Sequence, residues 1–375
     1  MAAPLKIGLI GTGGISRSHL PVFKDFPDKV KLTAVCDIFE DAAKERAAEA
    51  GVDDIYLDYE TMLNEADIDA VDICTGHDTH APIVIAAAKA GKHSLVEKPM
   101  GNDMDECRKM IEETDNAGVT LMIAHMLRFS PTTEAVKKLL AEGELGTINA
   151  AKIDINMNAV GSLREGHWML DGKAGGGIGM TNTIHETDIV RYLVGDVKSV
   201  TGVKKSISKR LLNGAEDMLC ATLEFENGAV GTVMCLWNSP RSPVSQGYTL
   251  YGTEGALYSL PTLPIYRGDH FGPVVVSSPT RDTPETAPIN RRDGSPSREM
   301  KGLEDIMGHF KQLEGGNHGL PSDNCFSNEI LHFAECCQTG KEPISSGKAI
   351  LGSMKLIFGI YEAAATGKTV QLADL

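Results

Sequence analysis

The chain has 375 residues, of which 42% are hydrophobic and 23% are charged, and its formal net charge at pH 7 is -15. This length exceeds the size at which a single hydrophobic core keeps growing, so we expect two domains of an ordinary globular protein. The acidic balance argues against nucleic acid and anionic membranes as partners, because binding to phosphate groups needs clustered Lys and Arg.

No segment of the sequence predicts export or membrane insertion. The residues Met1 to Pro4 lead directly into an apolar stretch at 6–10 that is too short for a signal peptide and fits a strand. The apolar run at 349–360 contains Lys355 and is too short to cross a bilayer. We therefore expect a cytoplasmic protein. The eight cysteines lack Cys-x-x-Cys spacing, so we expect reduced side chains and neither disulfides nor a cysteine zinc site.

The first 125 residues alternate short apolar strands with helical segments, which is typical of βαβ units on a parallel sheet. The predicted strands are 6–10, 31–37, 70–75, 93–97 and 119–124, and the predicted helices are 40–50, 82–90 and 104–117. Gly51, Gly91 and Gly118 stand where helix C-terminal caps are expected. We assign residues 1–126 to a Rossmann dinucleotide-binding domain.

The pattern changes after Phe129-Ser130-Pro131, where a helix through Leu140 precedes longer strands. Asn227-Gly228 between the apolar segments 218–225 and 229–236 predicts a hairpin. We expect residues 127–375 to form an α+β substrate-binding and oligomerisation domain with a large, mostly antiparallel open sheet. Helices would cover one face and a partner subunit the other, in a homodimer or homotetramer. The segment 261–297 lacks periodicity and is either an ordered loop over the site or a mobile excursion.

A glycine turn follows the first strand and opens a helix. In such a turn, glycines allow a tight bend and let backbone N–H groups approach a pyrophosphate at the positive end of the helix. Gly11, Gly13, Gly14 and Ile15 form this turn, and Ser16 replaces the usual third Gly or Ala. We expect a slightly looser contact between helix and strand at Ser16.

Asp37 closes the second strand, where a carboxylate accepts hydrogen bonds from ribose hydroxyls. It would repel a 2′-phosphate, and the next residues, Ile38 and Phe39, are not basic. We predict NAD as the cofactor and NADP as the less suitable one. The alternative is a solvated Asp at a strand end.

Several motifs resemble those of a known family. They are Cys74-Thr75-Gly76-His77-Asp78-Thr79-His80, the segment 91–99 ending in Glu97-Lys98-Pro99, Arg128-Phe129-Ser130-Pro131, the segment 175–185 with Asp188, the hairpin near Gly228, and Lys368. Through them the chain resembles, nearly end to end, the glucose–fructose oxidoreductase and inositol dehydrogenase family of sugar and cyclitol dehydrogenases. The resemblance implies that His80 and Glu97 lie near the dinucleotide, and we expect Thr75 and His77 there as well. Gly76-His77 departs from the family, in which relatives often have Pro-Asn.

The resemblance also implies that Lys98 lies beside the nicotinamide and the substrate hydroxyl. An ammonium there can stabilise alkoxide character as hydride leaves, and burial lowers its pKa. Glu97 would brace the site, and Pro99 would hold the turn through a peptide that is often cis in the family. The alternative is that Lys98 is an ordinary surface lysine.

His185 matches the family histidine that acts on the substrate hydroxyl, and its ordinary pKa of about 6.5 suits proton removal at neutral pH. Helical spacing predicts that Thr181, His185 and Asp188 share one face. Thr181 departs from the family, in which many relatives have Asp. A proton relay would then use Thr181, Asn182, Lys98 or water.

The remaining candidates are weaker. His77 and His80 are separated by two residues, but no third ligand is evident, so we predict no metal and keep helix capping as the alternative. Arg128 would reach the cleft after the fifth strand, and the second domain would contribute the substrate contacts Asn156, Asn158, His167, Trp168 and Asn182. Asn can bind sugar hydroxyls and Trp offers an apolar face. Each could equally be a core or surface residue.

Three functions fit the sequence. The first is NAD-dependent, reversible oxidation of a secondary hydroxyl of a sugar, sugar derivative or cyclitol. The second is a lyase or glycosidase that oxidises its sugar only transiently. The third is a non-enzymatic sugar or dinucleotide sensor, since fold alone does not determine function. Lys98 and His185 at predicted cleft positions favour an enzyme.

Overall fold

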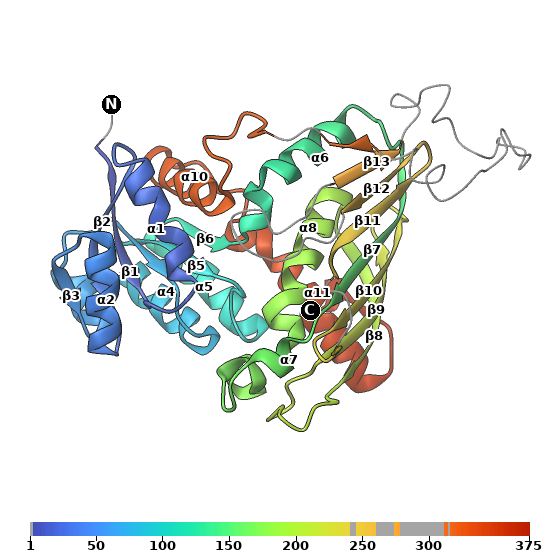
Figure 1. The fold of residues 1–375 in the computed structure, drawn as a ribbon, viewed down its shortest axis with the longest axis horizontal. Helices are drawn as coiled ribbons and strands as arrows, with labels where there is room; N and C mark the ends of the chain where they lie inside the picture. The colour runs from blue at the N-terminus through green and yellow to red at the C-terminus, as the bar shows by residue number, and fades with distance from the viewer. Residues whose placement is uncertain (1–2, 241–244, 260–273, 278–310, 314–315) are drawn as a thin grey trace, which may run out of the picture.

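The structure is a computed structural model that describes residues 3–240, 245–259, 274–277, 311–313 and 316–375. It contains a six-stranded sheet, in blue and cyan in Figure 1, and a nine-stranded sheet formed by the later part of the chain. The first sheet is parallel throughout, and the second is antiparallel except where β7 pairs with β10. This confirms the predicted fold class.

The first sheet has the strand order β3-β2-β1-β4-β5-β6. Its strands are β1 (Leu5–Ile10), β2 (Val30–Cys36), β3 (Asp54–Tyr56), β4 (Ala70–Ile73), β5 (His93–Glu97) and β6 (Leu121–Ala124). Its helices are α1 (Ser16–Asp25), α2 (Glu40–Ala50), α3 (Tyr59–Glu65), α4 (His80–Lys89) and α5 (Met104–Ala117). The strand order reverses between β1 and β4, and open α/β sheets bind ligands beyond the carboxyl ends of the strands at such a point.

Most of the predicted elements of this sheet occur with small differences at their ends. The bounds of β5, α2 and α5 are those predicted. Gly51 and Gly118 cap their helices in the left-handed conformation, with φ of 69° and 66°. β3 and α3 were not predicted from the sequence, because β3 has three residues and no buried face. A short edge strand leaves no alternation to detect.

The second sheet has the order β14-β13-β12-β11-β7-β10-β9-β8-β15. Its strands are β7 (Ile148–Asn156), β8 (Val197–Lys205), β9 (Met218–Phe225), β10 (Val230–Leu236), β11 (Ser245–Gly252), β12 (Ala256–Ser259), β13 (Val274–Ser277), β14 (Lys311–Gln312) and β15 (Val370–Gln371). The predicted hairpin is β9–β10, with Gly228 at a φ of 87°. Apart from β13, the segment 261–297 lies outside the described residues.

Buried and exposed residues alternate along β9 and β10, so one face of the sheet is covered. The helices of this part are α6 (Pro131–Ala141), α7 (Ala159–Ser162), α8 (Ile184–Val194), α10 (Cys325–Thr339) and α11 (Gly347–Thr366). α11 packs against β8, and α8 packs against α11 and β7. The other face exposes Val203, Val230 and Met234, and its occupation by a partner subunit stays a prediction.

The C-terminal helices also complete the core of the first sheet. Met354 and Ile357 of α11 join the same buried cluster as Val71 and Ile73 of the parallel sheet. By length and composition α11 is apolar enough to span a membrane, and it extends beyond the run noted in the sequence. Its packing against both sheets is that of a core helix. The domain boundary at residues 126 and 127 stays a prediction.

Candidate active site

Four loops meet beyond the carboxyl ends of neighbouring parallel strands. The glycine turn follows β1, Thr75 lies just beyond β4, Lys98 follows β5 and His125 follows β6. The helical segment that carries His185 comes from the other part of the chain and contacts this edge through Lys98. The strand order thus brings together residues that are far apart in sequence.

The glycine turn has the geometry that a dinucleotide requires. Gly11 has a φ of 91°, and a Cβ there would lie 2.6 Å from the carbonyl oxygen of Cys74, so only glycine fits. Gly13 and Gly14 are exposed, and a Cβ on either would meet no atom within 4 Å. Ser16 is buried and its hydroxyl donates to the carbonyl of Gly13 at 2.8 Å. The turn therefore leaves open space at the N-terminus of α1, where a pyrophosphate fits.

Asp37 is fixed beside this turn. One carboxylate oxygen accepts hydrogen bonds from the backbone N–H and the hydroxyl of Thr12, both at 2.8 Å. The other accepts from the backbone N–H of Phe39 at 2.9 Å. Arg46 of α2, which was not predicted for the site, is buried and donates to the carbonyl of Thr12 at 2.9 Å. Its place among alanines and other charged residues of the helix, Lys44 included, gave no signal of this role.

Lys98 lies directly after β5 and is half-buried, and the peptide bond between Lys98 and Pro99 is cis. Its Nζ donates to the backbone carbonyl of Thr181 at 2.8 Å. Burial lowers the pKa of Lys98, while the carboxyl groups of Glu97 and Glu186 act in the opposite direction. The ammonium therefore releases a proton more readily than an exposed lysine does.

Glu97 is directed into the protein. One carboxylate oxygen accepts the backbone N–H of Lys98 at 3.1 Å, and the other lies 3.3 Å from Nε2 of His19. Burial alone would raise the pKa of Glu97, but the hydrogen bond and charge of His19 hold it below its ordinary value. This orientation disfavours the predicted direct contact with the cofactor. It supports the predicted bracing of the turn.

The segment before His185 is shaped by glycines. Gly177 has a φ of 109°, and a Cβ there would lie 2.6 Å from a carboxylate oxygen of Glu216. That carboxylate also accepts the backbone N–H of Gly179 at 2.9 Å. A π-helical turn over Gly179–Thr183 follows and leads into α8, and such turns are frequent at functional sites. As a result Thr181 meets Lys98 through its carbonyl and not through its hydroxyl.

Arg128 is engaged inside the protein. It forms a bidentate pair with Asp188 at 2.8 and 2.7 Å, and it donates to the carbonyl of Ile344 at 2.6 Å. Only 5% of Arg128 is exposed, so its geometry disfavours the predicted substrate contact. The nearby charges of His125 and Arg128 outweigh burial and lower the pKa of Asp188 to about 2.

His125 is a further residue of the site that the sequence analysis missed. Its Nδ1 lies 3.3 Å from a carboxylate oxygen of Asp188, and its ring lies edge-on to that of His185 with 6.1 Å between centroids. Burial lowers the pKa of His125 to about 4, against the opposing charge of Asp188. Its position directly after β6 was the available signal. Asp188 thus connects to His185 through His125.

The two histidines of the predicted cofactor edge are both buried and engaged with backbone carbonyls. His77 Nδ1 donates to Gly175 at 2.9 Å, and His80 Nδ1 donates to Pro99 at 2.7 Å. Burial lowers the pKa of His77 to about 2. Thr75 is half-buried, and its hydroxyl accepts from that of Thr79 at 2.7 Å.

Within the described residues, the one group with metal-ligand side chains close together is His19, Asp72 and Cys74. It includes neither His77 nor His80. The eight cysteines are all free thiols, as expected.

The predicted substrate residues of the second part are only partly brought together. Trp168 is half-buried and its ring lies edge-on to His77, 4.5 Å between centroids, so it reaches the loop after β4. Asn182 accepts a hydrogen bond from the indole N–H of Trp237 at 3.0 Å. Asn158 is exposed at the start of α7 and stays a prediction. Asn156 and His167 are half-buried, and Nδ1 of His167 accepts the backbone N–H of Met169 at 3.2 Å.

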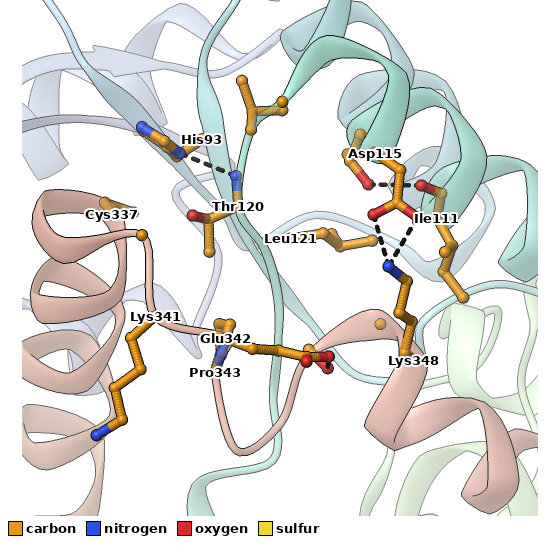
Figure 2. A pocket seen from close by; sticks show the side chains of 16 residues that line it. His93, Ile111, Asp115, Thr120, Leu121, Cys337, Lys341, Glu342, Pro343 and Lys348 are labelled. Carbon is orange, nitrogen blue, oxygen red and sulfur yellow. Dashed lines mark hydrogen bonds and ion pairs between the residues drawn. The ribbon is translucent and has the colours of Figure 1, made fainter.

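A pocket lies at the opposite edge of the parallel sheet, near the starts of β5 and β6 (Figure 2), and has a volume of about 390 Å³. Its polar groups bind one another: His93 accepts the backbone N–H of Thr120 at 2.9 Å, and Lys348 donates to Asp115 at 2.9 Å. None of the predicted site residues lines it. We therefore assign the candidate site to the carboxyl edge.

Comparison with known proteins agrees with this geometry. Residues 5–125 match the family described as "Oxidoreductase family, NAD-binding Rossmann fold", and residues 133–258 match "GFO/IDH/MocA C-terminal domain". A D-apiose dehydrogenase from Paraburkholderia graminis is 25% identical over 99% of this chain and 90% of its own. A myo-inositol 2-dehydrogenase from Thermotoga maritima is 30% identical over 68% of this chain and 75% of its own.

Among solved structures, levoglucosan dehydrogenase in complex with NADH superposes with a TM-score of 0.81 at 22% identity, covering 98% of this chain and 99% of that one. At this identity the likeness supports the fold. The family matches and the inositol dehydrogenase relative carry the assignment further. The chain therefore belongs to the GFO/IDH/MocA family of oxidoreductases, with an NAD-binding Rossmann domain.

Proposed function

We propose that the protein is an NAD-dependent dehydrogenase that reversibly oxidises a secondary hydroxyl of a sugar, sugar derivative or cyclitol. The observation that carries the proposal is the contact between Lys98 and Thr181, which holds a partly desolvated ammonium between the Rossmann edge and the helix of His185. The names of the D-apiose and myo-inositol dehydrogenase relatives support a polyhydroxylated substrate.

The cofactor fits the glycine turn, with the pyrophosphate at Gly13 and Gly14 and the adenosine ribose at Asp37. When bound, NAD supplies the hydride acceptor. Thr75, His77 and His80, in the segment that follows β4, would line the cofactor site. Because Asp37 is a carboxylate and the next residues, Ile38 and Phe39, are not basic, we propose that NAD is preferred over NADP.

Lys98 and His185 would handle the hydroxyl proton. The Lys98 ammonium stabilises negative charge on the substrate oxygen as the C–H bond breaks. His185 is the general base that removes the proton. Trp168, Asn158 and Asn182 are the proposed substrate contacts, with the Trp168 ring against the apolar face of the sugar.

A panel of aldoses, anhydrosugars and inositols, each offered with NAD, tests the proposal when NADH and the carbohydrate product are followed together. Stoichiometric NADH and ketone or lactone are expected for at least one compound. Product without net NADH would instead indicate transient oxidation coupled to elimination or glycosidic cleavage. Tight NAD binding with no turnover on any compound would contradict the enzyme and favour a sensor.

A further inference from the structure

A group of ionisable side chains is buried beneath the Glu97-Lys98-Pro99 turn. We name it the His19 cluster, and its members come from two neighbouring strands and two helices: His19 of α1, Asp72 of β4, Cys74 just after β4, Glu97 of β5 and Glu329 of α10. His19 and Asp72 are each 1% exposed and Glu329 is fully buried. Glu97 connects this cluster to a residue of the proposed proton transfer, through the backbone N–H of Lys98.

His19 bridges two carboxylates. Its Nδ1 lies 2.8 Å from Asp72, and its Nε2 lies 3.3 Å from Glu97. The thiol of Cys74 lies 3.7 Å from the same Nδ1 and from Asp72. A carboxylate near each ring nitrogen favours the imidazolium, in which both nitrogens carry hydrogen.

The surroundings support this charge. Burial by itself would lower the pKa of His19, but the charge and hydrogen bond of Asp72, with a contribution from Cys74, raise it well above its ordinary value. On the remaining side, the ring of Phe326 packs against His19 with 5.5 Å between centroids.

Glu329 completes the cluster as a neutral acid. Both of its carboxyl oxygens are buried without a hydrogen-bond partner in the described residues. Burial and the charges of Glu97 and Asp72 raise its pKa well above the ordinary value, against the opposing charge of His19. An ionised Glu329 would add a third negative charge around one imidazolium, so protonation is the favourable state.

We propose that His19 is a positioning residue of the active site: anchored by Asp72, its imidazolium holds the Glu97 carboxylate, which fixes the backbone of Lys98. The connection runs from His19 to one oxygen of Glu97, and from the other oxygen to the Lys98 N–H at 3.1 Å. It ends at the Lys98 ammonium and its contact with Thr181. The inference rests on the proposed function only in taking Lys98 as the reacting lysine.

Two substitutions separate the parts of this role. In His19→Asn the short amide stays near Asp72 but no longer reaches Glu97, and the charge is lost. In His19→Gln the longer amide reaches toward Glu97, also without charge. The matched control is His93→Asn, because His93 begins the same strand, β5, and accepts a backbone N–H at its other end.

We expect His19→Asn to lower kcat by about 10- to 100-fold, as for a misplaced catalytic group, with KM for NAD changed by less than about threefold. His19→Gln should recover part of the loss, and His93→Asn should keep wild-type kcat. Without His19 the pKa of Glu97 rises, so the acid limb of the kcat profile should move to higher pH in His19→Asn. Folded His19→Asn and His19→Gln with wild-type kcat and pH profile would overturn the proposal.

The charge of His19 can be measured in the unmodified protein by NMR after labelling its histidines with nitrogen-15, using His19→Gln to assign the signal. We expect two protonated ring nitrogens at pH 8. A neutral ring with a single N–H at pH 7 would overturn the proposal. This measurement needs no substrate, so it holds even if the sugar panel fails.

Discussion

The Nζ of Lys98 lies 2.8 Å from the backbone carbonyl oxygen of Thr181. This hydrogen bond joins the end of β5 to the helical segment that carries His185, so the two proposed proton-handling groups are held by one contact. Because the contact uses a carbonyl, it does not depend on the side chain at position 181. The departure from Asp at this position therefore leaves the placement of Lys98 intact.

Replacing Lys98 with Met should lower kcat/KM for the sugar by about 1,000-fold or more, because the variant keeps the volume but loses the charge that stabilises the alkoxide. NAD affinity, measured by fluorescence titration, should change little. The matched control is Lys92→Met, since Lys92 also donates to a backbone carbonyl, that of Ile68 at 2.7 Å, away from the site. Near-normal turnover in Lys98→Met would contradict the assignment of this residue.

Replacing Thr181 with Val tests whether its hydroxyl takes part in a proton relay. Oγ1 of Thr181 is buried without a partner in the described residues, and Val has nearly the same shape. We expect kcat to stay within about fivefold of wild type, because the carbonyl that binds Lys98 is retained. A loss of kcat of two orders of magnitude, with wild-type kcat in the His93→Asn control, would instead assign the Thr181 hydroxyl to the relay.

The parallel half of the fold could be predicted closely because its signals are local. Apolar strands, helix-forming segments and capping glycines lie within a few residues of one another, as for Gly51 and α2. β3 and α3 escaped because they are short, and the π-helical turn at Gly179–Thr183 has no sequence pattern of its own. The return of α11 to the first sheet depends on packing between distant segments, which periodicity does not encode.

The candidate site likewise consists of residues that local motifs predicted and residues that only the packing of distant segments brings together. Motif and strand position indicated Lys98, His185 and the glycine turn. The buried partners of these residues could not be predicted from the sequence, because they are distant along the chain: His19 pairs with Asp72 across 53 residues. Arg128 was expected in the cleft, and it pairs with Asp188 instead.

The cofactor preference is tested at Asp37. Replacing it with Ser removes the carboxylate that faces the ribose site and opposes a 2′-phosphate. We expect the ratio of kcat/KM for NAD to that for NADP to fall by about 10-fold or more, mainly through KM. The control is Asp41→Ser on the exposed start of α2, which should leave the ratio unchanged. Equal efficiency of both cofactors with the wild-type protein would contradict the preference itself.

The buried pair of Arg128 and Asp188 should dominate the acid stability of this region. Asp188→Asn leaves the guanidinium without its counter-charge, so we expect the free energy of unfolding at pH 7 to fall by about 3–5 kcal/mol. Urea denaturation followed by circular dichroism measures the change. The control is Lys198→Ala, which removes an exposed ion pair with Glu224 and should have little effect.

The difference in the free energy of unfolding between wild type and Asp188→Asn depends on pH because the pKa of Asp188 is lowered. The carboxyl has a pKa of about 2 in the folded protein and about 3.9 in an unfolded chain. Its ionised form is therefore favoured by folding, and the stabilisation is complete above about pH 4 and is lost as the pH falls through about 2. The gap between wild type and Asp188→Asn should be constant from pH 7 to pH 5 and narrower at pH 3. A gap that is equally wide at pH 3 would mean that Asp188 stabilises the fold by its shape and hydrogen bonds and not by its charge.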